Sequence, residues 1–219
     1  MVPSIFLKFG QNVLEYFLDI YWNFPTLENN VRQNDSLERQ TRDYFTIPDL
    51  IEELMSLNWR HKNIRKHVRR SLEAYKGDDY MQYINIQEPE YRRIGIHENY
   101  DFQVLLCYFP PLKGNPPHNH GDAHCCFKVM KGEVHEKQYR IPNHTGPMQW
   151  RAIRIYEPGE INETSKLLNL HSCYNNSQSE IAVAVVVYFP PLTSCYTYDE
   201  STGLARLALT PDSSLTIET

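Results

Sequence analysis

Apolar side chains in the first part of the chain recur at the spacing of helices. Before residue 25 they fall three and four positions apart, which predicts a helix whose apolar face is formed by Val13, Leu14, Phe17, Leu18 and Tyr21. Charged side chains interrupt this segment, so we do not expect it to span a membrane. Residues 28–43 are polar, with little to bury, and predict an exposed linker.

Two further helices are predicted between Thr46 and about residue 90. Thr46 places a capping hydroxyl before Pro48 and Asp49, an order typical of a helix start. The apolar positions after this start are Leu50, Ile51, Leu54 and Met55, and a second set before Gly77 comprises Ile64, Val68, Leu72 and Tyr75. Both sets have helical spacing, so we expect two amphipathic helices.

From Tyr91 onward the pattern changes to short β-rich runs separated by Gly, Pro and Asn. The clearest runs are residues 102–109, 125–130, 152–156, 167–170 and 181–189. Each predicts a strand, and strands at this spacing form a sandwich or a small barrel such as the jelly roll. The expected fold is mainly β, a jelly-roll barrel with N-terminal helices packed against it. Residues 1–45 are then a helical extension and linker, and residues 46–219 one domain.

Composition narrows the function to small-molecule chemistry. The 219 residues carry a formal net charge of −5 with 41% hydrophobic residues. The chain is therefore neither disordered nor basic enough to predict a nucleic-acid surface. Its five cysteines are an odd number without the spacing of a disulfide scaffold. We expect a cytoplasmic monomer with reduced thiols and with no nucleic-acid or membrane partner.

Histidines supply the most informative pattern. His118 and His120 are two residues apart after a Pro-Pro pair, so both rings project to one side if the segment is extended. His171 follows an apolar run and is the candidate third ligand of a metal. Three nitrogens suit copper, zinc and iron, so the pattern does not identify the metal. A zinc hydrolase is one alternative.

The remaining histidines are not expected to bind metal. An isolated histidine is more often a surface residue or a satisfied core residue, and this applies to His61, His67, His97, His135 and His144. His124 lies four residues after His120, which is the spacing of a helix face and not of a strand. We therefore leave it out of the candidate site.

The candidate ligands belong to an ordered set of residues that resembles known families. The first cupin motif is matched by Gly114, His118, His120 and Gly132, and the end of the second by His171 and Asn175. Most cupins have a glutamate ligand where this chain has Cys125. From about residue 47 to 209 the chain resembles the mammalian-type cysteine dioxygenase family, through Tyr91-Arg92-Arg93, the His118–Cys125 segment, His171, and Tyr188-Phe-Pro-Pro191 through Cys195.

This resemblance implies an enzyme, a non-haem Fe(II) dioxygenase that converts L-cysteine and O2 to cysteine sulfinic acid. The implied iron ligands are His118, His120 and His171. The substrate carboxylate would be bound by Arg93 and Tyr91, whereas Arg92 would point elsewhere. The resemblance also implies catalytic roles, and a thioether crosslink, for Cys125 and Tyr188.

One position departs from the family pattern. Members usually carry a histidine two residues before the crosslinking tyrosine, where this chain has Val186, so we expect a slow or incomplete crosslink. Two alternatives stay open: an iron dioxygenase for another small thiol such as 3-mercaptopropionate, and a catalytically silent cupin that binds a ligand. Arg93 argues against cysteamine, which has no carboxylate. We expect packed thiols at Cys107, Cys126 and Cys173, and assign no role to Cys195.

Overall fold

The computed structural model describes residues 46–141, 146–164 and 170–210. The helix predicted around residues 13–21, the linker at residues 28–43 and His144 lie outside these ranges. Among the helices that are described, none is long and apolar enough to cross a membrane.

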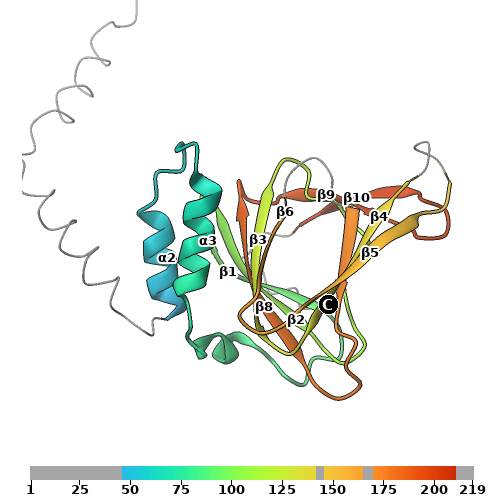
Figure 1. Ribbon diagram of the computed structural model, residues 1–219, viewed down its shortest axis with the longest axis horizontal. Coiled ribbons are helices and arrows are strands. Elements are labelled where there is room, and N and C mark those ends of the chain that lie inside the picture. Colours follow the sequence, from blue (N-terminus) through green and yellow to red (C-terminus); the bar gives the residue numbers. More distant parts are fainter. Residues whose placement is uncertain (1–45, 142–145, 165–169, 211–219) are drawn as a thin grey trace, which may run out of the picture. The chain divides into compact units, whose positions relative to one another are not determined.

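The two helices predicted after Thr46 are confirmed (Figure 1). They are α2 (Ile47–Met55) and α3 (Ile64–Ala74), followed by the short 3-10 helix η1 (Asp79–Tyr83). The start of α2 is a capping box, in which the Thr46 hydroxyl accepts from the backbone N–H of Asp49 at 3.4 Å. The Asp49 carboxylate in turn accepts from the backbone N–H of Thr46 at 2.8 Å.

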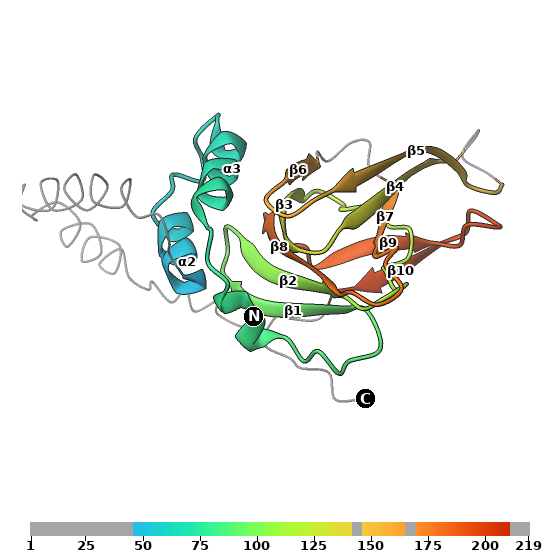
Figure 2. The same ribbon diagram turned by 60° about the horizontal axis from the view of Figure 1, so that its bottom comes forward.

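The strands form antiparallel sheets. They are β1 (Arg92–Glu98), β2 (Gln103–Phe109), β3 (His124–Lys131), β4 (Val134–Arg140), β5 (Gln149–Tyr156), β6 (Ile161–Thr164), β7 (Leu170–Tyr174), β8 (Ala182–Phe189), β9 (Ser194–Tyr198) and β10 (Ala205–Leu209). The larger sheet has the order β1-β2-β8-β3-β6, a second sheet has the order β5-β4-β7, and β9 and β10 form a ribbon. Figure 2 shows them as the walls of one sandwich. Within the described ranges no ladder joins the sheets, so the predicted jelly roll is present but its barrel is not closed.

Most of the predicted strands are confirmed, and one needs correction. The runs at residues 102–109, 125–130, 152–156 and 181–189 coincide with β2, β3, β5 and β8. The run at residues 167–170 does not end before His171. Strand β7 begins at Leu170 and places His171 inside the ladder with β4, while residues 167–169 lie outside the described ranges.

Strand β8 separates two buried layers because its side chains alternate between them. Val183, Val185, Val187 and Phe189 join the cluster beneath α2 and α3. The alternate residues, Ala182, Ala184, Val186 and Tyr188, join a second cluster between the sheets. The helices therefore cover one face of the larger sheet, and the other face lines the interior of the sandwich.

A lysine ties the helical layer to this sheet. Lys128 of β3 is only 6% exposed, and its Nζ donates to the backbone carbonyls of Leu72 at 2.9 Å and of Tyr75. Helix α3 has no basic residue of its own in its last turn. Lys128 thus supplies both the hydrogen bonds and the positive charge that a helix C-terminus favours.

Candidate metal centre

Backbone pairing brings the distant histidines together. His118 and His171 form an isolated antiparallel bridge, in which each backbone N–H donates to the other residue's carbonyl, at 2.8 and 3.1 Å. His118 also forms a bridge with Thr197 of β9. Gly114 lies against β7, where a Cβ would collide with the backbone of Cys173 and Tyr174. Glycine is therefore what allows the segment that leads to His118 to lie this close to β7.

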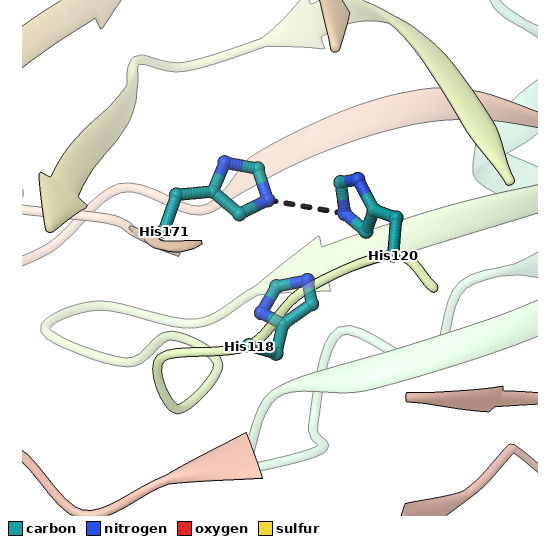
Figure 3. Close-up of side chains that lie close together, drawn as sticks. All are labelled: His118, His120 and His171. Carbon is teal, nitrogen blue, oxygen red and sulfur yellow. Dashed lines mark hydrogen bonds between the residues drawn. The ribbon is translucent and has the colours of Figure 1, made fainter. Parts of the chain in front are cut away.

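The three rings converge on one point (Figure 3). Their ligand atoms all lie within 4.8 Å of one another, and Nε2 of His171 is 3.1 Å from Nε2 of His120. Two imidazole nitrogens bound to one metal ion at about 2.0–2.1 Å lie about 3 Å apart. In the described part of the chain this is the one group of His, Cys, Asp or Glu side chains with the spacing of a metal site.

Hydrogen bonds fix the tautomers of two of these rings. Nδ1 of His118 faces the backbone carbonyl of Pro116 at 3.0 Å, and Nδ1 of His171 faces the Glu136 carboxylate at 2.6 Å. A carbonyl or carboxylate oxygen can only accept, so each Nδ1 carries the proton. The Nε2 lone pair of each ring is then free to bind a metal.

Glu136 is the partner that the sequence interpretation missed. It is 1% exposed on β4, and its carboxylate also accepts from Gln138 Nε2 and Tyr156 Oη, each at 3.0 Å. Burial raises its pKa, but the hydrogen bonds from His171, Gln138 and Tyr156 outweigh this and hold the pKa below its ordinary value. Glu136 is therefore a buried carboxylate that orients His171, as outer partners of metal-bound histidines do.

The electrostatics of the cluster favour neutral imidazoles. Burial, with a smaller contribution from nearby His171, lowers the pKa of His118 to about 3. Burial is also the main reason that the pKa of His120 lies well below its ordinary value. The Nδ1 atom of His120 is buried without a partner among the described residues. Neutral nitrogens beside a buried carboxylate fit a divalent transition metal.

A cavity adjoins the histidines between the sheets. Its wall on the larger sheet includes Cys125, Val186 and Tyr188. Cys125 and Tyr188 are directly opposite each other in the β3–β8 ladder, and both side chains are buried. Val186 points inward as predicted, on the same face as Tyr188. The two residues of the implied crosslink are therefore neighbours in the cavity wall.

Tyr91 belongs to the wall of this cavity, and Arg93 lies over Tyr188 of the same wall. The Tyr91 hydroxyl is 3.3 Å from Cys107 Sγ. The Arg93 guanidinium carbon is 5.5 Å from the centre of the Tyr188 ring, and its buried Nε has no partner among the described residues. Arg92 points away, exposed, with its Nε 3.0 Å from the Glu88 carboxylate. Arg93 is thus a partly buried cation without a carboxylate beside it among the described residues.

The other cysteines do not all occupy the same environment. All five cysteines are free and buried. Cys107 and Cys173 line the cavity, whereas Cys126 packs in the cluster beneath the helices. None of the other described histidines joins the metal cluster, namely His61, His67, His97, His124 and His135. Asn115 also lines the cavity, and no sequence pattern singled it out.

Comparisons with known proteins agree with this site. A family model described as cysteine dioxygenase type I matches residues 38–201. Cysteine dioxygenase type 1 of Danio rerio is 27% identical over 163 residues, which cover 72% of this chain and 81% of the relative. The Homo sapiens protein of the same name is 25% identical over 162 residues, with the same coverage.

Among solved structures, a conserved protein with a double-stranded beta-helix domain from Klebsiella pneumoniae has a TM-score of 0.43 and 19% identity. The match covers 60% of this chain and 94% of that one. The family match itself spans well over half of the chain and includes the three histidines, Arg93 and Tyr188. The chain therefore belongs to the cysteine dioxygenase type I family, thiol dioxygenases built on the cupin fold.

Proposed function

We propose that this enzyme is a non-haem iron(II) dioxygenase that converts L-cysteine and O2 to cysteine sulfinic acid. The observation that carries the proposal is the convergence of His118, His120 and His171 near Arg93, a partly buried arginine that has no acidic partner in the described ranges. In the overall reaction the substrate thiol and O2 give the sulfinic acid. Both oxygen atoms finish on sulfur, so no further reductant is needed.

The three histidines would hold the iron through Nε2. Ferrous iron there would supply a Lewis acid that favours the thiolate form of the substrate and a redox-active centre for its reaction with O2. Glu136 keeps the proton of His171 on Nδ1 and makes Nε2 the more basic nitrogen. The apolar part of the cavity wall, which includes Phe127 and Val186, limits the access of water.

Arg93 and Tyr91 would receive the substrate carboxylate. A guanidinium offers planar paired donors that match a carboxylate, and the Arg93 Nε still lacks a partner in the described ranges. Tyr91 keeps its proton, because burial raises its pKa well above the ordinary value. It therefore adds a neutral hydroxyl donor on the same side.

Cys125 and Tyr188 are proposed as the crosslinking pair. Their facing positions in the β3–β8 ladder, in the wall of one cavity, support this assignment. The thioether would form with loss of two hydrogens, which O2 can accept. Val186 offers the phenol no hydrogen bond, so we propose that the crosslink forms slowly.

A second substrate is favoured by the chemistry of the cavity wall. No Asp or Glu is present among the described residues that line it, so nothing there is specific for a substrate ammonium group. 3-Mercaptopropionate, which has a carboxylate but no amine, is therefore the second candidate. The remaining proposals are a cytoplasmic location, a monomer without nucleic-acid or membrane partners, and a catalytic domain that begins at about residue 46.

The test is oxygen consumption and sulfinate formation by iron-loaded protein with L-cysteine, 3-mercaptopropionate and cysteamine. Arg93→Ala should raise the KM for L-cysteine about 10- to 100-fold, because a charge-assisted hydrogen bond is lost. Arg92→Ala is the matched control and should leave KM unchanged. No oxygen uptake with any of the thiols would support the ligand-binding alternative. Equal kinetics of the two arginine variants would place the carboxylate elsewhere.

A further inference from the structure

The three candidate ligands differ in how their rings are held (Figure 3). Nδ1 of His118 faces the Pro116 carbonyl, and Nδ1 of His171 faces the Glu136 carboxylate. Nδ1 of His120 is buried and has no partner among the described residues, although its Nε2 lies 3.1 Å from that of His171. The orientation of the His120 ring therefore depends on the rings that it packs against and on the backbone that carries it.

That backbone leaves strand β9 between His118 and His120. On one side of the bridge between His118 and β9, the Tyr198 N–H donates to the Pro117 carbonyl at 2.8 Å. On the other side, the Asn119 N–H donates to the Tyr196 carbonyl at 3.1 Å. A regular antiparallel ladder would return this bond from the Tyr196 N–H to the Asn119 carbonyl. The Tyr196 N–H donates to Asn119 Oδ1 at 3.0 Å instead, so a side chain takes the place of a backbone acceptor.

The same oxygen holds the turn that contains His120. Asn119 Oδ1 also accepts from the Gly121 N–H at 3.4 Å, and the His120 carbonyl accepts from the Ala123 N–H at 2.9 Å. Gly121 has a φ of +50°, in the left-handed region that glycine adopts readily. An asparagine that binds the backbone two residues on in this way forms an Asx turn. The chain thus turns away from β9 at the ligand itself, while the Tyr196 and Gly121 N–H groups share one acceptor.

We propose that Asn119 is a positioning residue that orients His120 through the backbone, so that its ring converges with those of His118 and His171. Asn119 does for His120 what Glu136 does for His171, but from the preceding residue and without touching the ring. The inference rests on the proposed function in one respect, namely that the three histidines hold a metal ion. It does not depend on which thiol is the substrate.

Asn119→Ala tests the role, because it removes the shared acceptor. Metal-free full-length protein is titrated with Co(II), whose visible absorption bands depend on the number and arrangement of its ligands. The Kd for Co(II) should rise about 10- to 100-fold, as it does when an outer partner of a metal ligand is lost. At saturating Co(II) the spectrum should approach that of His120→Ala protein. A purely structural role would leave the affinity and the spectrum unchanged, and that result would overturn the proposal.

Two matched variants separate the oxygen of the Asn119 amide from its NH2 group, which donates to the Tyr198 hydroxyl at 3.4 Å. Asn119→Asp keeps the acceptor and loses only this donor, so it should restore the Co(II) spectrum and prevent the loss of affinity. Tyr198→Phe removes the same contact without adding a charge, and it should behave like the unaltered protein. Loss of affinity in both variants, as large as in Asn119→Ala, would overturn the role of the oxygen.

Asn119→Gln serves if Asn119→Ala does not fold. The longer side chain keeps an amide of the same polarity but moves its oxygen one carbon farther from the backbone. An Asx turn needs the shorter reach of asparagine, so the Kd for Co(II) should rise several-fold and the spectrum should change as in the Ala variant. An unchanged Kd and spectrum in Asn119→Gln would contradict the positioning role.

The unaltered protein separates failure of this inference from failure of the proposed function. If it binds Co(II) but, loaded with iron, consumes no oxygen with any thiol, the proposed activity is wrong and the Co(II) titrations still decide the role of Asn119. If it oxidises thiols while Asn119→Ala binds Co(II) as before, the proposed activity stands and the positioning role is overturned. Unaltered protein that binds neither metal would overturn both.

Discussion

The two faces of the five-stranded sheet are equally buried but differ in chemistry. Beneath the helices, strand β8 presents Val185 and Val187 to a cluster that is almost entirely apolar. One residue away along the same strand, Val186 and Tyr188 face cysteines and, across the cavity, the three histidines. Burial therefore does not identify the functional face. What marks it is the presence of buried polar atoms that lack partners of their own or are held in one protonation state.

The largest difference between the faces should appear when a metal ligand is removed. His118→Ala takes away one of three ligands, and its effect on metal affinity should exceed the roughly 10- to 100-fold cost of losing an outer partner. Metal content by mass spectrometry and thiol-dependent oxygen uptake should both fall to background. His97→Ala is the matched control, because the His97 ring packs against Phe102 and is not part of the histidine cluster. Stoichiometric iron in His118→Ala protein would contradict the ligand assignment.

Glu136→Gln should show that metal affinity depends on the charge of Glu136 as well as on the three histidine ligands. The amide keeps the shape of the side chain but binds the His171 Nδ1–H less strongly, so iron affinity should fall about 10- to 100-fold. Competition with a metal chelator measures this. Glu133→Gln is the control, because Glu133 is exposed and lies 3.4 Å from His135 instead. Similar affinities of the two variants would mean that the carboxylate does not support the metal.

Two equivalent substitutions at neighbouring positions of β8 compare the polarity of the two faces directly. Val187→Thr places a hydroxyl in the apolar cluster beneath the helices, which should cost about 1–3 kcal/mol in the free energy of unfolding. Val186→Thr places the same hydroxyl in the cavity wall, where polar groups are near, and should cost less than about 1 kcal/mol. Denaturant unfolding of the metal-free proteins gives both values. Equal costs would mean that the two layers do not differ in polarity.

The stability of the metal-free protein should also depend on pH in mild acid. The folded-state pKa of His118 is about 3, below its ordinary value of 6.5, so the unfolded chain binds this proton first. The contribution of neutral His118 to the free energy of unfolding is therefore fully present above about pH 6.5 and is lost as the pH falls toward 3. The slope is about 1.4 kcal/mol per pH unit for each histidine that charges only when unfolded. His118→Gln should flatten it, and an unchanged slope would assign the acid sensitivity to other groups.

The sequence predicted the parts of this molecule that depend on neighbouring residues. The capping box at Thr46 and the apolar spacing of α3 are local signals, and both helices begin where expected. Strand β4 was not singled out, because it carries His135, Glu136 and Lys137 in place of an apolar run. Strand β4 is buried because it pairs with β7, and the local sequence pattern of β4 carries no information about that distant partner.

The candidate site shows the same limit. The ordered resemblance identified His118 and His171, although they lie far apart in the chain. Glu136 and Asn115 were missed, because a polar residue becomes a buried partner only through tertiary pairing. Cys107 was expected to be a packed thiol. Its strand is buried on both faces, so alternation alone did not tell which face would line the cavity.

The lysine that joins β3 to α3 also sets an order of events during synthesis. The last carbonyls of α3 receive their donor from Lys128, a residue 53 positions later than Tyr75. At about 5–20 residues per second, the ribosome adds those residues in roughly 3–10 s. During that interval the C-terminal end of α3 has only water to satisfy its carbonyls. The helices are made first, but they gain their final support only after the sheet that they cover has emerged.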